Sequence, residues 1–353
     1  MAGQLNDDVR FDLWEPAVKL WQEDVWFGIG PAHYNYRFRP YRPQWVQRQP
    51  DRVHNDYLNT LTDYGIVGAV LVLSAWVLLF TGVVKTWRFV RGSSGDLGGR
   101  NSNKFALVLG ASAGLLAILV HSAADFNMHI PANALVAITL MAMLSGSLRF
   151  ATEQHWHNAR FWSKAVMTVI LLAGLAYLGR QEIRHEKESR WLAEAASSSA
   201  TRADQLAALE HAFAIEPTNF ETAYAIGENL RSQAWDAADP EKLGKAMEWY
   251  KRTTSIDPYY GYGFLGCGLC LDRLDKESES WPDFDRAIKL DPNGYYTAAW
   301  VGWHYVQAGD YAAARDWFER SYRLSSDGNK IAHDYLEIVR KRMLEAASRP
   351  GPG

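Results

Sequence analysis

The sequence has only two cysteines and a small net charge. A net charge of −3 argues against a nucleic-acid binder, which normally presents a strongly basic surface. The two cysteines, Cys267 and Cys270, form a single C-x-x-C pair, whereas a tetrahedral metal site would need a second pair. Both fall inside a helical repeat that requires small apolar side chains, so the sequence favours packing over a redox or metal-binding role. We expect no metal and no cofactor.

Charged residues are missing from three long stretches. Residues 66–84, 105–124 and 131–148 contain no Asp, Glu, Lys or Arg, and a membrane-spanning helix needs about 20 predominantly apolar residues. A fourth run, residues 165–179, is shorter, but Lys164 and Arg180 at its ends could reach the two membrane interfaces. We therefore predict about four spans, at 65–85, 104–123, 131–149 and 163–180.

Basic residues alternate between the loops that join these spans. The loop after the first span holds Lys85, Arg88, Arg91, Arg100 and Lys104, and the loop before the fourth holds Arg149, Arg160 and Lys164. The 125–130 loop holds no Lys or Arg. Because Lys and Arg in short loops mark the cytoplasmic side, residues 1–64, 125–130 and those after 180 are predicted to be extracytoplasmic.

The first segment opposes this rule, because it is itself rich in basic residues. It carries Arg10, Lys19, Arg37, Arg39, Arg42, Arg48 and Arg52. A segment of about 60 residues lies at the limit where the rule holds, and binding of an anionic substrate would explain the charges. Arg37, Arg39 and Arg52 are candidate ligands for such a substrate, since the guanidinium group bonds two phosphate oxygens. The alternative is an interfacial aromatic belt whose arginines pair with lipid phosphates.

An amphipathic pattern opens the same segment. Apolar residues spaced 3, 4, 3 and 4 apart predict one face of a helix lying on a membrane or on other spans: Phe11, Trp14, Val18, Trp21 and Val25. The stretch Gly28-Ile29-Gly30-Pro31 then ends the helix and begins an irregular loop rich in Tyr, Arg and Pro.

The stretch Arg52-Val53-His54-Asn55-Asp56-Tyr57-Leu58 precedes the first span. The pattern predicts a short helix from His54 to Tyr64 that runs into Gly65, with His54, Tyr57 and Leu58 on one face. A histidine can accept a proton from a hydroxyl near neutral pH, which makes His54 a candidate base. Asn55 and Tyr57 are candidate substrate contacts, although Asn55 or Asp56 could instead cap the helix.

These residues, taken in order, resemble a known family. Arg10-x-x-Leu13-Trp14, Gly28-Ile29-Gly30-Pro31, His54-Asn55-x-Tyr57-Leu58 and Asp63-Tyr64-Gly65 with Gly68 are similar to the periplasmic loop of the O-antigen ligase superfamily. The later stretch His121-Ser122-Ala123-Ala124-Asp125-Phe126, with Asn127, Pro131 and Asn133, is similar to the signature that ends the family's penultimate periplasmic segment. The resemblance covers roughly residues 1–150.

The resemblance implies a metal-independent membrane glycosyltransferase. Members move a glycan from an undecaprenyl-pyrophosphate carrier onto lipid A core, a protein or another glycan. It implies a multi-pass protein of the bacterial inner membrane with this loop on the periplasmic side. His54 then matches the loop histidine proposed as base for the acceptor hydroxyl, and Arg10 the arginine that engages the pyrophosphate. The chemistry is sensible, because a good leaving group needs only positive charge and a base for the nucleophile.

Two alternatives stay open beside the ligase. One is a polysaccharide polymerase, which would use a carrier-linked acceptor. The other is a non-enzymatic, membrane-anchored tetratricopeptide scaffold in which the loop residues are relics. Family members carry several spans ahead of the loop, whereas this sequence opens almost at the loop. We therefore expect a C-terminal fragment or a truncated paralogue, and it is a separate question whether this chain alone is active.

A second pair of ionisable residues lies at the outer end of the second predicted span. Ionisable groups at membrane depth are costly and usually functional. Asp125, four residues after His121, is expected either to orient His54 or an arginine, or to cap a turn that Asn127 shapes. Three other histidines fall on opposite sides of the predicted membrane and are expected at the surface: His129, His155 and His157.

The last part of the sequence repeats. A three-residue pattern recurs that begins with Ile or Leu and usually continues with an acidic residue and Pro. It ends at Pro217, Pro258, Pro292 and Ser326, and the last two intervals are 34 residues. This is the tetratricopeptide period. Internal positions agree with it, namely Gly227, Gly268 and Gly302, then Ala246, Ser280 and Ala314, then Tyr250, Phe284 and Phe318. We predict hairpins at 220–260, 261–294 and 295–328, a partial one before them and a capping helix at 331–347.

Such repeats stack into a curved solenoid whose concave groove holds an extended ligand or a protein partner. Aromatic residues that could line the groove are Tyr259, Tyr260, Tyr262, Tyr295, Tyr296, Trp300 and Trp303, although most fit a core better. The predicted fold is thus all-α, with an extracytoplasmic loop (1–64), a transmembrane domain (65–184), a tetratricopeptide domain (185–347) and a disordered tail (348–353).

Overall fold

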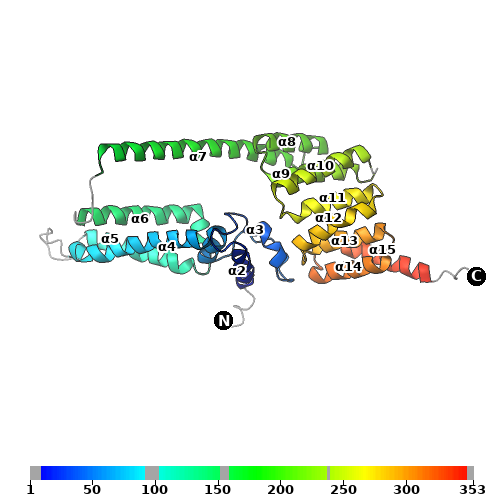
Figure 1. Ribbon diagram of the computed structural model, residues 1–353, viewed down its shortest axis with the longest axis horizontal. Helices are drawn as coiled ribbons and strands as arrows, with labels where there is room; N and C mark the ends of the chain where they lie inside the picture. The colour runs from blue at the N-terminus through cyan, green and yellow to red at the C-terminus, as the bar shows by residue number, and fades with distance from the viewer. Residues whose placement is uncertain (1–8, 92–102, 152–158, 237–238, 348–353) are drawn as a thin grey trace, which may run out of the picture. The chain divides into compact units, whose positions relative to one another are not determined.

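The computed structural model describes residues 9–91, 103–151, 159–236 and 239–347, and every regular element in these ranges is a helix (Figure 1). The chain divides into two compact units. Unit 1 comprises Met1–Tyr41 and Arg48–Arg160, and unit 2 comprises Arg42–Gln47 and Phe161–Gly353. The predicted all-α class, with long apolar helices followed by helical repeats, is confirmed. The predicted disordered tail, His155, His157 and the basic residue Arg100 lie outside the described residues.

Unit 1 packs three apolar helices together: α4 (Asp56–Arg91), α5 (Asn103–His121) and α6 (Pro131–Ala151). Their facing sides bury a cluster that includes Val83, Val108, Leu115 and Leu144. Their outer sides expose large aliphatic residues, and Val120 is 76% exposed. Apolar surface of this extent would be unfavourable in water and suits contact with lipid. Asp56–Trp87 and Pro131–Leu148 are long and apolar enough to cross a membrane, while Phe105–His121 is apolar but shorter.

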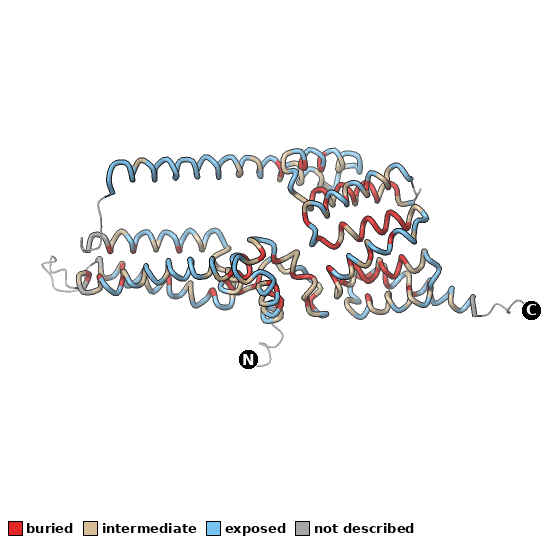
Figure 2. Tube along the Cα trace, in the orientation of Figure 1, coloured by how far each residue is buried: buried red, intermediate tan, exposed pale blue. Residues whose placement is uncertain are grey.

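The third helix that is long and apolar enough to cross a membrane is α7 (Phe161–Ala195), in unit 2. Its apolar half is exposed along its length (Figure 2), with Leu175 65% exposed. Its second half packs on α8 (Arg202–Ile215), where Arg184 binds Glu216 at 2.7 Å. The predicted span 163–180 and the first residues of the predicted repeat domain therefore belong to one continuous helix.

Short elements form the N-terminal part of unit 1: α1 (Val9–Asp12), α2 (Trp14–Glu23), α3 (Tyr34–Arg37) and the 3-10 helices η1 (Arg39–Tyr41) and η2 (Asn127–His129). The predicted aromatic stripe is not the face by which α2 packs. Ala17 and Leu20 are the residues fully buried there, and Thr62 of α4 donates to the Ala17 carbonyl at 3.2 Å. Phe11 is exposed.

α4 is interrupted at Gly65, whose φ of 62° and ψ of −166° are not helical. In an unbroken helix, the carbonyls of Thr62 and Asp63 would accept from the amides of Ile66 and Val67. Here the Thr62 and Asp63 carbonyls accept instead from Ile29 N (2.9 Å) and Gly30 N (3.1 Å). The freed amides of Ile66 and Val67 donate to the carbonyls of Val25 (2.9 Å) and Trp26 (3.2 Å).

The loop before Pro31 thus replaces, group for group, the hydrogen bonds that the break removes. The exchange leaves no room for side chains: a Cβ on Gly65 would lie 2.3 Å from the Trp26 carbonyl carbon, and one on Gly28 would lie 2.4 Å from the Thr62 oxygen. The Gly28-Ile29-Gly30 sequence and Gly65 are therefore two halves of one contact, which fixes the loop at the end of α4 that precedes the apolar span.

Unit 2 contains the repeats, as antiparallel helix pairs α9 (Phe220–Ala234) with α10 (Pro240–Ile256), α11 (Gly261–Arg273) with α12 (Glu277–Leu290), and α13 (Tyr295–Gln307) with α14 (Tyr311–Leu324). These bounds match the three predicted hairpins, and α15 (Lys330–Ala347) follows at the predicted capping position. The repeating glycines meet the repeating aromatic residues: a Cβ on Gly302, for example, would lie 2.9 Å from the Phe318 ring. Close helix contact explains the 34-residue pattern.

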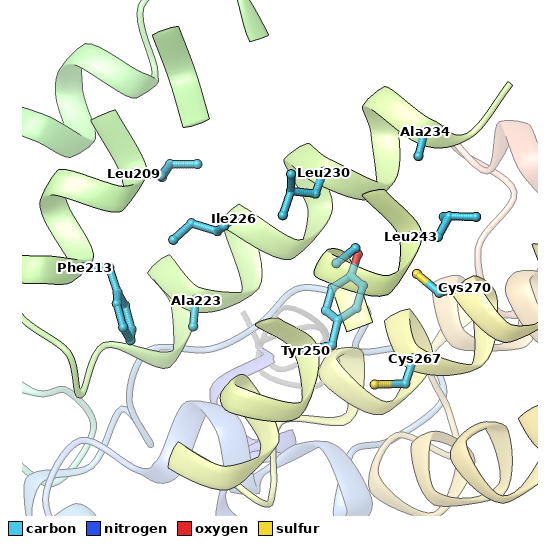
Figure 3. Packing of buried hydrophobic residues seen from close by; sticks show 11 residues of the cluster. Leu209, Phe213, Ala223, Ile226, Leu230, Ala234, Leu243, Tyr250, Cys267 and Cys270 are labelled. Carbon is cyan, nitrogen blue, oxygen red and sulfur yellow. The ribbon is translucent and has the colours of Figure 1, made fainter. Parts of the chain in front are cut away.

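Both cysteines lie in the core of the repeats. Cys267 and Cys270 pack in one cluster with Leu243 and Tyr250 (Figure 3), and both thiols are free. Burial raises the pKa of Cys270 to about 12 and the pKa of Cys267 further still. A thiol that stays protonated in an apolar cluster is a poor nucleophile and a poor metal ligand, which agrees with the packing role predicted for the pair.

Candidate functional site

His54 lies at the end of α4 that precedes the apolar span, but outside the helix. α4 begins at Asp56, and the Asn55 side chain accepts from the amides of Tyr57 and Leu58, both at 3.0 Å. The predicted helix from His54 is therefore wrong in its first residues, because Asn55 caps a helix that begins at Asp56. His54 has a φ of +55°, a left-handed conformation that is uncommon for a residue with a Cβ.

This conformation places His54 against the Asp125–Phe126 turn. Its Nδ1 lies 3.8 Å from Oδ1 of Asp125, and its ring meets the Phe126 ring edge-on, with centroids 4.7 Å apart. Both polar side chains are partly exposed, at 30% for His54 and 22% for Asp125. Within the described residues His54 Nδ1 has no hydrogen-bond partner. The imidazole is thus held by packing on Phe126 and faces the Asp125 carboxylate.

Arg10 reaches the same turn from a distant part of the sequence. Its Nη1 donates to the Ala124 carbonyl at 3.1 Å, so the guanidinium and the His54 imidazole contact neighbouring residues. The Asp125 carboxylate also accepts from the Phe126 amide at 2.8 Å and lies 4.0 Å from His121 Nδ1. The two expectations for Asp125 are therefore compatible: it shapes the turn with one oxygen and faces two imidazoles.

Asp56 ties this turn to α4. Its amide donates to the carbonyls of Ser122 (2.9 Å) and Asp125 (3.2 Å), and its Oδ2 accepts from the Met128 amide at 3.0 Å. Its Oδ1 lies 2.9 Å from Nδ1 of His129. The Asp56 residue is 5% exposed, so the chain buries a carboxylate to hold η2 and the turn in place.

His129 is the site residue that sequence reasoning missed. It was expected at the surface, whereas its side chain is only 24% exposed and is held by Asp56. Its Nε2 also lies 3.4 Å from the Asn59 amide nitrogen. One signal could have found it: the 125–130 loop was already predicted on the side of the membrane that holds His54, and His129 lies in that loop.

A pocket of about 390 Å³ opens beside this turn, lined by Ala32, Asn35, Asp51, Arg52, Phe126 and His129. The residues of its wall carry a guanidinium, an imidazole, a carboxylate, an amide and one aromatic ring. Phe126 is common to the pocket and to the packing of His54. Of the arginines singled out from the sequence, Arg52 is the one that lines this pocket.

The structure places the remaining candidate residues in other contacts. Arg37 donates to Glu23, and the buried Arg39 donates to Gln49 at 2.6 Å. Arg42 belongs to unit 2, where its guanidinium lies 2.7 Å from the buried Asp291 carboxylate. Substrate-binding roles for Arg37 and Arg39 stay predictions.

Two tyrosines near the site, Tyr57 of α4 and Tyr34 of α3, also have structural partners. The exposed Tyr57 donates to the Leu119 carbonyl at 2.7 Å, and its substrate-binding role stays a prediction. Burial raises the pKa of Tyr34, whose hydroxyl donates to the Leu13 carbonyl at 2.7 Å. This phenol stays neutral and joins the loop to the start of α2, so it fixes the backbone near the pocket residues Ala32 and Asn35.

In the described part of the chain, no group of three or more His, Cys, Asp or Glu side chains could hold a metal ion.

The aromatic residues proposed to line the groove of the repeats differ in exposure. Trp303 is 3% and Tyr260 8% exposed, whereas Tyr259 is 38% exposed.

Comparison with known proteins supports the resemblance. Residues 1–73 match the family model described as O-antigen ligase. No curated protein matches the chain. Among solved structures, the crystal structure of MamA protein is similar at 16% identity and a TM-score of 0.34, over 48% of this chain and 99% of that chain. Residues 1–73 of this chain are therefore similar to the O-antigen ligase family, and the helices and the family match together indicate a ligase-like bacterial membrane protein.

Proposed function

We propose that this chain acts in a membrane glycosyltransferase reaction of the O-antigen ligase type. It would move a glycan from undecaprenyl pyrophosphate to a hydroxyl of an acceptor glycan, lipid or protein. The reaction would take place on the periplasmic side of the bacterial inner membrane. His54 acts as the base for the acceptor hydroxyl, and Arg10 binds the pyrophosphate.

The observation that carries this proposal is the convergence of His54 and Arg10 on one turn. Arg10 donates to the Ala124 carbonyl, and His54 packs on Asp125 and Phe126. The Arg10 side chain thus contacts a residue 114 positions away in the sequence, directly before the residue that His54 faces. A base and a fixed cation on one turn provide what transfer from a pyrophosphate carrier requires, because the leaving group needs charge stabilisation and the nucleophile needs deprotonation.

In the proposed step, the acceptor oxygen forms a bond to the anomeric carbon of the glycan while the bond from that carbon to the carrier phosphate breaks. The hydroxyl proton passes to the His54 imidazole. The electron pair of the broken bond remains on the pyrophosphate. Arg10, together with Arg52 of the neighbouring pocket, would offset the charge of the pyrophosphate. Asp125 would orient His54 and stabilise the imidazolium that forms.

Glycan transfer by His54→Ala and Arg10→Ala variants of the full chain tests the proposal. Removing a general base lowers the rate by about 10²–10⁴-fold, and removing a cation that stabilises developing charge lowers it by about 10²–10³-fold. The assay is transfer of a labelled glycan from the polyprenyl carrier in membranes, normalised to inserted protein. His333→Ala and Arg315→Ala are matched controls, because both side chains lie in unit 2 and are well exposed.

Unchanged transfer in both site variants, with normal insertion, would overturn the proposal. A non-enzymatic scaffold built on the repeats of unit 2 would then be the better account. A polymerase would instead lose chain extension, with the carrier-linked glycan as acceptor, in the same two variants. A protein partner in the groove of the repeats is compatible with each of these functions.

A further inference from the structure

His129 and Asp56 form a carboxylate–imidazole pair that the proposed mechanism does not use. Asp56 Oδ1 lies 2.9 Å from His129 Nδ1, while its Oδ2 accepts from the Met128 amide. A carboxylate has no proton to donate at neutral pH, so the shared hydrogen lies on Nδ1 of the imidazole. This fixes the tautomer and leaves Nε2 with the lone pair.

The pair is built into the fold rather than left at the surface. Asp56 is 5% exposed, and its backbone amide bonds the Ser122–Asp125 turn. Its neighbour Asn59 is fully buried and donates to Asp63 at 2.7 Å. Asn59 also lies 3.4 Å from His129 Nε2, close to the limit for a hydrogen bond. A contact of that length satisfies the lone pair weakly, and a better donor can replace it.

The lone pair belongs to a wall residue of the pocket that also contains Arg52, Asp51, Asn35 and Phe126. Donors, acceptors and one aromatic residue around about 390 Å³ suit a sugar ring, which presents hydroxyls at its edge and C–H groups on its face. An anion alone would need no aromatic wall and would be repelled by Asp51. Phe126 contacts the His54 ring, so a sugar bound here would lie beside the proposed base.

We propose that His129, with its tautomer set by Asp56, is a positioning residue that accepts a hydrogen bond from a hydroxyl of the acceptor sugar in this pocket. This inference rests on the proposed function, because it assigns the acceptor side of the same site. His54 takes the proton of the reacting hydroxyl, and His129 binds another hydroxyl of the same sugar. The two histidines then have different kinetic signatures.

Three substitutions in the full chain separate this role from a structural one. His129→Leu keeps the volume and removes the acceptor. His129→Gln restores a carbonyl oxygen near the position of Nε2. Asp56→Asn keeps an oxygen for the Met128 amide, but its NH₂ group donates to Nδ1 and moves the imidazole hydrogen to Nε2. The first and third variants should raise KM for the acceptor about 10-fold or more, with kcat within about twofold. His129→Gln should recover most of the binding.

The assay uses a detergent extract of cell-envelope glycolipids as the acceptor, at a series of dilutions. The same extract treated with periodate, which cleaves vicinal diols, is the control for sugar hydroxyls. An unchanged KM in both His129→Leu and Asp56→Asn would overturn the inference. A fall in kcat equal to that of His54→Ala would also overturn it, since His129 would then serve the chemical step.

A measurement that does not depend on turnover distinguishes failure of this inference from failure of the proposed function. Diethyl pyrocarbonate modifies accessible neutral imidazoles, and peptide mass spectrometry reads each histidine separately. The extract should protect His129 at least about threefold, the periodate-treated extract should not, and the exposed His333 should react equally in both. Protection without any glycan transfer would remove the proposed reaction and keep the sugar site. Transfer without protection would keep the reaction and remove the site.

Discussion

Replacing Gly65 by alanine tests the backbone exchange that joins the loop to α4. The φ of 62° and ψ of −166° fall in a region that residues with a Cβ essentially avoid. The new Cβ would also lie 2.3 Å from the carbonyl carbon and oxygen of Trp26. These are backbone atoms, so a side-chain rotation cannot relieve the clash, and the loop must move away from α4.

The cost can be worked out from the contacts. Strain at such a φ and ψ costs about 1–3 kcal/mol. Displacing the loop also weakens the four crossed hydrogen bonds of Ile29, Gly30, Ile66 and Val67, each worth about 0.5–1.5 kcal/mol net. We expect a local loss of about 3–5 kcal/mol, because part of the bonding can be recovered by closing the helix.

Amide hydrogen exchange of the detergent-solubilised chain reads these four groups directly. At about 1.4 kcal/mol for each factor of ten, exchange at Ile29 and Gly30 should accelerate by roughly 10²- to 4 × 10³-fold in Gly65→Ala. Ile66 and Val67 can form helical bonds again and should change less. Because the loop and the His54 region meet at this end of α4, glycan transfer should fall as well.

Gly146→Ala is the matched control. Gly146 lies in α6, and a Cβ there meets nothing within 4 Å among the described residues. Alanine in an open helical position stabilises a protein by about 0.4–1 kcal/mol. Equal exchange at Ile29 and Gly30 in wild type and Gly65→Ala would refute the reasoning. It would mean that the crossed bonds do not hold the loop.

Two further predictions concern the repeats. Burial raises the pKa of Cys270 to about 12 and of Cys267 beyond that, so iodoacetamide at pH 8 should label neither thiol until denaturant unfolds the chain; rapid native labelling would contradict the packing role. Burial also raises the pKa of Asp272, despite its bonds to His304 (2.9 Å) and Ser280. The stability this group contributes is therefore present below about pH 4, the usual pKa of aspartate, and is lost as pH rises through the higher folded value. In Asp272→Asn, the denaturation midpoint should depend less on pH across that window. If the midpoint changes with pH as steeply as in the wild type, the role assigned to Asp272 is wrong.

Much of the fold could be predicted because its signals are local. A run of residues without charge predicts a membrane helix by itself. Gly302 and Phe318 each lie 34 residues after the equivalent residue of the preceding repeat, which predicts successive helical hairpins. The start of α4 was predicted too early because His54 fits the apolar spacing, while Asn55 captures the first free amides. A capping side chain outweighs periodicity at a helix end.

The candidate site divides in the same way. His54, Arg10 and Asp125 could be selected because their motifs resemble a family, and the structure brings them to one turn. The predicted topology places the His129 loop on the side of His54, but the pairing of His129 with Asp56, 73 positions away in the sequence, could not be predicted. A histidine in a short loop has the same appearance in a sequence whether or not a buried carboxylate holds it.

The sequence by itself determined the all-helical class, the apolar helices and the repeats, since each follows from hydrophobic spacing within one element and needs no distant partner. The tertiary structure alone decided which polar groups meet: the exchange of bonds between the loop and the Gly65 break, the pairing of Asp56 with His129, and the pocket with Arg52. Such contacts join segments whose separation is set by the packing of α4, α5 and the turn after it, and no local pattern in the chain encodes that distance.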